Sequence, residues 1–125
     1  MDDGLIYHMC TRAEWERGRL VGRYAGSTQD PGSTQNGADG FIHFSTAAQV
    51  AASAAKHRAG QDDLVLIEVQ AAALGPALRW EISRGGDRFP HLYGSLSLLA
   101  VKRVAELPLG PDGQHIFPWS LGAGA

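Results

Sequence analysis

Hydrophobic and polar residues along the chain follow patterns that predict mainly strands. Residues 64–69 form a continuous apolar run rich in β-branched side chains, which predicts a strand buried on both faces. Residues 5–10 and 78–82 each present different side chains on alternate faces, as expected for strands. Further strands are expected over residues 41–45 and 98–107, and a last edge strand over residues 114–119.

Two helices are expected between these strands. Thr11 and Glu14 have the spacing of a capping box, so a helix is predicted over residues 12–19. The same spacing recurs before an alanine-rich run of strong helical propensity that extends to residue 59. After residue 64, strands follow one another without alternating helices. This order predicts an α+β fold with two helices and a mixed or antiparallel sheet.

Two long segments lack a periodic pattern and are predicted to be loops. Residues 25–40 contain the tetrapeptide Gly-Ser-Thr-Gln twice, and both a lid over a site and a passive surface loop remain open for them. Residues 83–95 form the second long loop, which is rich in glycine. The 125 residues fit a single domain with a core over about residues 5–119. The tail over residues 121–125 is expected to be frayed.

Composition and charge narrow the class of protein. The formal net charge is −2, so no whole-molecule field favours nucleic acid or an acidic membrane as a partner. A single cysteine, Cys10, excludes an internal disulfide and a cysteine-based zinc cluster. No apolar run approaches the roughly 20 residues needed to cross a bilayer, and the first residues lack the layout of a signal peptide. We therefore expect a soluble cytoplasmic protein, of undetermined oligomeric state.

The strand over residues 41–45 carries the most distinctive candidate chemistry. Because side chains alternate across a strand, Phe41, His43 and Ser45 are expected on one face and the apolar residues between them on the other. A glycine-rich loop precedes this strand and a helix start follows it. Polar groups at the end of a rigid strand beside a loop are common in ligand sites. The segment is therefore a candidate site.

Two more histidines extend this candidate site. His8 lies in the first predicted strand, and His91 lies in the second long loop between Arg88 and Tyr93. Imidazole both donates and accepts hydrogen bonds and titrates near neutrality, so it suits phosphate binding as well as proton transfer. Arg88 and Tyr93 supply donors suited to an anion, although a purely structural role for both remains open. The candidate catalytic residues are His8, His43 and His91, and the candidate ligand-binding residues are Phe41, Ser45, Arg88 and Tyr93.

A metal centre is the main competing interpretation of these histidines. Zinc or iron could take nitrogen ligands from several of them and an acid such as Glu81. No pair of histidines has the local spacing of a ligand motif, so the sequence does not favour a metal site and none is assigned. Cys10 is expected to be a small buried hydrophobe and not a nucleophile. The histidines considered for the metal are His8, His43, His91 and His115.

Four ordered motifs resemble a small, mostly bacterial family called domain of unknown function 952. They are IYHM at residues 6–9, GFIHFS at residues 40–45, LRWE at residues 78–81 and RFPHLYG at residues 88–94. The resemblance covers nearly the whole chain. The family is grouped by fold with the ADP-ribosyltransferases, including the RNA 2′-phosphotransferases that consume NAD. The resemblance therefore implies an ADP-ribosyltransferase-like fold with a split sheet.

The resemblance also implies roles for individual residues. In the wider group a histidine of the first strand hydrogen-bonds a ribose of NAD, and His8 occupies the matching place. Phe41, His43 and Ser45 match the position that lines the nicotinamide pocket. Many transferases also carry a glutamate that assists transfer, and neither Glu68 nor Glu81 lies in a recognisable version of that motif. The lack of a recognisable glutamate motif favours ligand binding over catalysis.

The expected function is thus the binding of a nucleotide-like or phosphorylated ligand in an ADP-ribosyltransferase-like cleft. NAD is the candidate substrate, and transfer of an ADP-ribosyl or phosphate-linked group is the reaction that the resemblance implies. Two alternatives stay open. One is a non-catalytic ligand-binding or interaction module, and the other is a metal-dependent hydrolase that uses the histidines.

Overall fold

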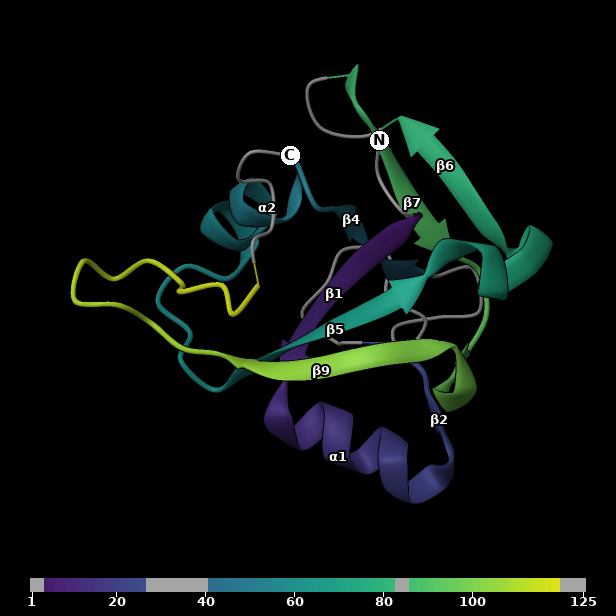
Figure 1. Ribbon diagram of the computed structural model, residues 1–125, viewed down its shortest axis with the longest axis horizontal. Helices are drawn as coiled ribbons and strands as arrows, with labels where there is room; N and C mark the ends of the chain where they lie inside the picture. The colour runs from purple at the N-terminus through teal and green to yellow at the C-terminus, as the bar shows by residue number, and fades with distance from the viewer. Residues whose placement is uncertain (1–3, 27–40, 83–85, 120–125) are drawn as a thin grey trace.

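The computed structural model describes residues 4–26, 41–82 and 86–119. Its largest sheet has four strands (Figure 1), with β5 at Leu64–Gln70 between β1 at Leu5–Thr11 and β9 at Val101–Leu107. The short strand β4, at Ser45–Thr46, pairs with the other edge of β1. Every ladder among the described residues is antiparallel. The predicted α+β class with an antiparallel sheet is confirmed.

A second sheet holds the candidate site residues. Its order is β3-β7-β6, with β3 at Ile42–His43, β7 at Arg88–Leu92 and β6 at Leu78–Ile82. A separate two-stranded ladder joins β2 at Arg23–Tyr24 to β8 at Leu96–Ser97. The connections include 3₁₀ segments at Ala71–Ala77 and Leu98–Ala100.

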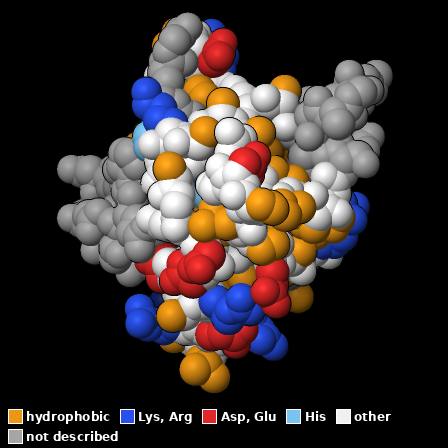
Figure 2. All heavy atoms as spheres, turned by 90° about the vertical axis from the view of Figure 1, so that its left-hand side faces the viewer, with side chains coloured by type: hydrophobic (Ala, Val, Ile, Leu, Met, Phe, Trp, Pro, Cys, Tyr) orange, Lys and Arg blue, Asp and Glu red, His pale blue; other side chains and the backbone are white. Residues whose placement is uncertain are grey.

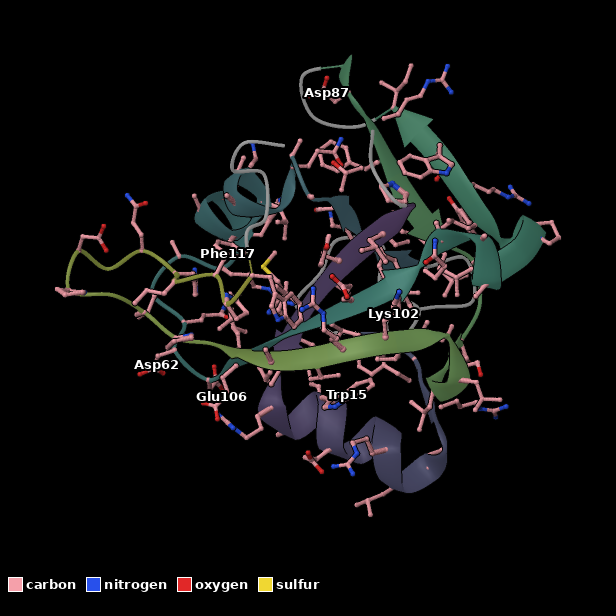
Figure 3. The ribbon with its side chains drawn as sticks, viewed as in Figure 1. Trp15, Asp62, Asp87, Lys102, Glu106 and Phe117 are labelled. Atoms are coloured by element: carbon pink, nitrogen blue, oxygen red, sulfur yellow. The ribbon has the colours of Figure 1, made fainter. Side chains whose placement is uncertain are left out.

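The central strand β5 is buried on both faces, as its apolar run predicts. Val65 and Ile67 belong to the core cluster that contains Trp15 of helix α1 (Arg12–Val21). Leu66 belongs to a second cluster with helix α2 (Val50–His57), against which Phe117 packs. Trp15 and Phe117 accordingly lie on opposite sides of the four-stranded sheet (Figure 3).

The two helices begin differently although both starts have capping-box spacing. In α1 the hydroxyl of Thr11 accepts from the amide of Glu14, and the Glu14 carboxylate accepts from the amide of Thr11. In α2 the side chain of Gln49 accepts from the amide of Thr46 at 3.0 Å, but the helix starts only at Val50 and has no side-chain cap. A turn therefore separates β4 from α2.

The prediction of one long loop over residues 83–95 is wrong, because β7 is the middle strand of the second sheet. Proline lacks the amide hydrogen that a central strand uses, and Pro90 therefore suggested a turn. In the structure Pro90 lies where β3 ends, and its carbonyl accepts a hydrogen bond from the amide of Phe44 at 3.0 Å. Residues 83–85 lie outside the described residues.

Three other predicted elements differ from the structure. The strand expected over residues 41–45 is divided into β3 and β4 around Phe44. The strand expected over residues 98–107 begins at Val101, after a 3₁₀ turn. The edge strand over residues 114–119 is wrong, since these residues contribute a single bridge between Leu109 and His115. Residues 27–40 of the possible lid at residues 25–40 lie outside the described residues, as does the tail over residues 121–125.

Helices α1 and α2 are both short. Within residues 4–26, 41–82 and 86–119, no helix has the length and apolar character needed to span a membrane.

Candidate functional site

The chain passes from the second sheet to the four-stranded sheet at Phe44. On either side of this point, alternate side chains belong to the core or to the candidate site. Ile42 and Phe44 are both fully buried in the main core cluster. His43 points to the other face of the second sheet, where its ring stacks on Phe89 with centroids 5.6 Å apart. The alternation predicted for residues 41–44 is therefore present, with apolar side chains inward and the histidine on the opposite face.

His43 and His91 face each other across neighbouring strands. They are register partners in the β3–β7 ladder, and their ring centroids lie 5.2 Å apart. The ring of Phe41 stacks on His91 at 4.0 Å with an angle of 20° between planes. Folding thus joins the motif of residues 41–45 to the motif of residues 88–94 on one sheet face.

A carboxylate from the third strand orients His91. Glu81 of β6 accepts a hydrogen bond from Nδ1 of His91 at 2.8 Å and another from the hydroxyl of Tyr93 at 2.7 Å, both at Oε1. The bonds from Tyr93 and His91 lower the pKa of the Glu81 carboxyl, and the same carboxylate raises the pKa of Tyr93. Because a carboxylate only accepts, Nδ1 of His91 carries the hydrogen.

With Nδ1 bound to Glu81, Nε2 is the nitrogen of His91 that remains to contact a ligand. His91 is only 5% exposed, and its Nε2 has no hydrogen-bond partner among the residues that the structure describes. A buried polar atom without a partner costs free energy comparable to a lost hydrogen bond. In the neutral ring this atom offers a lone pair to a donor or a metal ion, and in the charged ring it offers a proton.

The sequence pattern did not bring out three further residues of this face. The sequence indicates Glu81 only as a possible metal ligand or as an unconvincing transfer glutamate. Arg79 lies over the Tyr93 ring at 4.9 Å, and His57 of α2 lies edge-on to His43 at 6.2 Å. Arg79 and His91 are register partners in the β6–β7 ladder. The alternation of residues 78–82 could have indicated Arg79 and Glu81 if the partner strand had been predicted.

His8 lies behind this face and not on it. Its ring is 1% exposed and donates from Nδ1 to the main-chain oxygen of His43 at 2.6 Å. Since that position carries the hydrogen, Nε2 of the neutral ring accepts from the hydroxyl of Tyr24 at 2.7 Å. His8 thus contacts the main chain of His43, while the rings of His43 and His91 meet on the other side.

Two other predicted site residues lie away from this face. The hydroxyls of Ser45 and Ser53 share a hydrogen bond of 2.8 Å, and both residues are fully buried. Arg88 is exposed at the start of β7. By strand alternation its side chain lies on the face opposite to that of His91.

A separate apolar groove runs between α2 and the C-terminal segment. It is lined by Ala51, Ala54, Ala55, Ala59, Gly113, Gln114, His115 and Phe117. Figure 2 shows this side of the molecule, where hydrophobic side chains gather above a band of charged ones. None of the predicted site residues lines this groove. Within the described ranges, no group of three or more His, Cys, Asp or Glu side chains is arranged to hold a metal ion.

Solved structures provide close relatives of the chain. It is similar to protein CC0527 from Caulobacter crescentus, whose crystal structure is 46% identical, with 90% of this chain and 93% of that chain covered and a TM-score of 0.80. The solution structure of CC0527 matches at 47% identity over 89% and 90% of the two chains, with a TM-score of 0.74. Comparison with curated proteins finds no significant match.

A family model described as "Protein of unknown function (DUF952)" matches residues 9–104. The matched span includes His43, Glu81 and His91, and so contains the face described above. The family recognised from four short motifs is thus found independently over most of the chain. The chain belongs to the DUF952 family.

Proposed function

We propose that the protein binds a nucleotide-like or phosphorylated ligand on the imidazole face, meaning the sheet face that presents His43, His91, Glu81 and Tyr93. The observation that carries the proposal is the buried Nε2 of His91, which lacks a partner among the described residues while Nδ1 is fixed by Glu81. With Nδ1 fixed in this way, Nε2 accepts a hydrogen bond from a ligand hydroxyl when the ring is neutral and donates one to a phosphate oxygen when the ring is charged.

The surroundings of His91 support an anionic ligand with an aromatic part. The guanidinium of Arg79 lies over the ring of Tyr93 at the margin of the face and adds a positive charge. Phe41 stacks on His91, so an apolar aromatic surface adjoins the polar atoms. Aromatic rings stack on nucleobases whatever their identity, which makes a nucleotide a suitable class of ligand.

The relation to the ADP-ribosyltransferases belongs to the same proposal. NAD is the first ligand to test, and transfer of an ADP-ribosyl or phosphate-linked group is the first reaction. In this proposal Phe41 and Tyr93 border the ligand, and His8 positions His43 through its main-chain oxygen. Glu81 acts through His91, whose ring it orients. The proposal places the protein in the cytoplasm, where a reduced Cys10 is expected.

Calorimetric titration with NAD, ADP-ribose and 2′-phosphorylated RNA tests this function. We expect one of them to bind, and we expect His91→Gln to weaken binding at least tenfold in a protein that stays folded. His115→Gln is the matched control, because Nε2 of His115 bonds the main-chain oxygen of Gln61 away from the imidazole face. Absence of binding by all three ligands at millimolar concentration, or equal binding by both variants, would overturn the proposal.

Turnover separates catalysis from binding alone. Bound NAD that is released unchanged, with no nicotinamide formed, would assign the protein to the non-catalytic alternative. Formation of nicotinamide that stops in His91→Gln and continues in His115→Gln would assign it to the transferases or hydrolases of NAD.

A further inference from the structure

The pair formed by His43 and His91 has a spacing that fits a shared metal ion. An imidazole nitrogen bound to zinc lies about 2.1 Å from the ion, so two ring centres at a tetrahedral angle lie roughly 5 Å apart. The ring centroids of His43 and His91 lie 5.2 Å apart. Facing residues of antiparallel strands are commonly this close, so the spacing permits a metal site and a second feature is needed to indicate one.

The second feature is the carboxylate behind His91. Histidines that bind metals almost always donate their other ring hydrogen to a carboxylate, a carbonyl or water, which fixes the tautomer and strengthens the ligating nitrogen. Glu81 accepts from Nδ1 of His91 at 2.8 Å. The Nε2 atom of His91 therefore carries the lone pair, and this atom is buried without a partner in the described part of the chain.

The third feature is that the potential ligands in and beside the pair are imidazole nitrogens, which determines the kind of metal. His57 lies edge-on to His43 at 6.2 Å, so a further imidazole is close to the pair but does not complete a three-residue site. Nitrogen ligands favour zinc, nickel and copper, whereas magnesium and calcium prefer oxygen ligands.

We propose that His43 and His91 bind one divalent late-transition-metal ion, with Glu81 orienting His91 and water completing the coordination. The metal site goes beyond the proposed nucleotide ligand. It uses the same Nε2 atom of His91, so the ion and a ligand oxygen would not bind this nitrogen together, and the metal can be tested without any nucleotide. Affinity should follow the general order for nitrogen sites, in which copper binds more tightly than nickel and zinc.

Titration of tag-free, chelator-treated protein with Zn²⁺, Ni²⁺ and Cu²⁺ tests the site. We expect saturation at one ion per chain and loss of this binding in His43→Ala and in His91→Ala. Glu81→Gln should keep the fold and weaken the metal 10- to 100-fold, about the effect of removing an orienting carboxylate from a metal-bound histidine. His115→Ala is the control for binding by a histidine outside the pair and should leave the titration unchanged.

Cobalt absorption provides a readout that a merely structural role for Glu81 would not move. Bound Co²⁺ should give a visible spectrum that disappears in His91→Ala and shifts in Glu81→Gln. Absence of one-to-one binding, or binding that survives in both histidine variants, would overturn the inference. Nucleotide binding by the chelator-treated protein would then still support the proposed function, so the two failures are distinguishable.

Discussion

At the scale of single residues, His8 is held by two hydrogen bonds that leave its ring buried and fixed. The main-chain oxygen of His43 accepts from one nitrogen, and the hydroxyl of Tyr24 occupies the other. The rings of Tyr24 and Phe44 pack against it at 5.2 and 5.5 Å. Its position in the first strand was predictable, but its partners come from residues 16 and 35 positions away.

Removal of the hydroxyl of Tyr24 tests this role. Tyr24→Phe keeps the ring and leaves Nε2 of His8 buried without its partner, which should lower the free energy of unfolding by about 1–3 kcal/mol. Tyr93→Phe is the matched control, because Tyr93 is half-buried and Glu81 keeps its bond from His91. Urea denaturation of both variants measures the difference. Equal losses would show that the bond to His8 adds nothing to stability.

Alternation along residues 41–44 was also predictable at this scale, because Ile42 and Phe44 are large apolar residues on either side of a histidine. The position of Ser45 was not predictable: alternation places it on the face of His43, but in the structure it lies in the interior. Its hydroxyl bonds Ser53 of α2, and no local pattern states that the chain leaves one sheet and joins another after Phe44. The site residues could therefore be named as candidates, but their grouping could not be derived from spacing.

At the scale of elements, α1 is the clearest case of local sequence setting a boundary. The capping box at Thr11 and Glu14 fixes the first turn. The helix ends at Gly22, whose φ of 100° is favourable only for glycine. Both signals lie within the element itself, which explains why the start of the helix was predicted correctly and the end differed by only two residues.

Replacement of the capping hydroxyl measures its contribution. Thr11→Ala should lower the free energy of unfolding by about 1 kcal/mol, since the amide of Glu14 loses its acceptor. Thr46→Ala is the control, because α2 has no side-chain cap although Thr46 has the same spacing to Gln49. Its effect should stay within about 0.5 kcal/mol. A loss in Thr46→Ala as large as in Thr11→Ala would contradict the assignment of the cap.

Strand β7 shows why other elements could not be predicted locally. Pro90 and the nearby glycines are typical of a loop. The segment is a strand because it pairs with β3 on one side and β6 on the other. Its neighbours β3 and β6 flank it in the sheet although both precede it in the sequence, and β3 comes from a distant part of the chain. The proline falls at the position where β3 ends, so the missing amide hydrogen removes little of the ladder.

At the scale of the whole molecule, Glu68 connects the three long strands of the main sheet. Its carboxylate accepts two hydrogen bonds from Arg103 of β9, at 2.8 and 2.9 Å, and one from Tyr7 of β1 at 2.8 Å. Arg103 in turn lies over the ring of Trp119 at 3.9 Å. Glu68 therefore links the three strands, and Arg103 extends this link to Trp119 of the C-terminal segment, which also packs against the cluster of Leu66.

This arrangement makes stability depend on pH. Hydrogen bonds from Arg103, and then from Tyr7, lower the pKa of Glu68 below its ordinary value of 4.5. A carboxyl with a lowered folded-state pKa stabilises the fold above its unfolded pKa, and this stabilisation is lost as the pH falls through the folded value. The wild-type protein should therefore lose this contribution only below about pH 4.5.

Arg103→Met tests the link, because it leaves the Glu68 carboxylate buried with Tyr7 alone. We expect a larger loss of stability at pH 7 than in the control variant, because the Glu68 carboxylate stays buried, and the difference from wild type should shrink as the pH falls and Glu68 takes up a proton. Arg12→Met is the control, since it removes the exposed pair with Glu106 and should have little effect on stability. A pH-independent difference for Arg103→Met, measured by chemical denaturation, would contradict this account.

The peptide unit that joins His43 to Phe44 links the interior of the protein to the imidazole face. Its oxygen is bound by the interior ring of His8, and its nitrogen is bound to Pro90 in the sheet that carries the imidazole face. Substitutions on the imidazole face and substitutions in the interior around His8 therefore act on the same peptide unit. A redesign of the imidazole face that shifts this peptide unit would also require changes in the interior around His8.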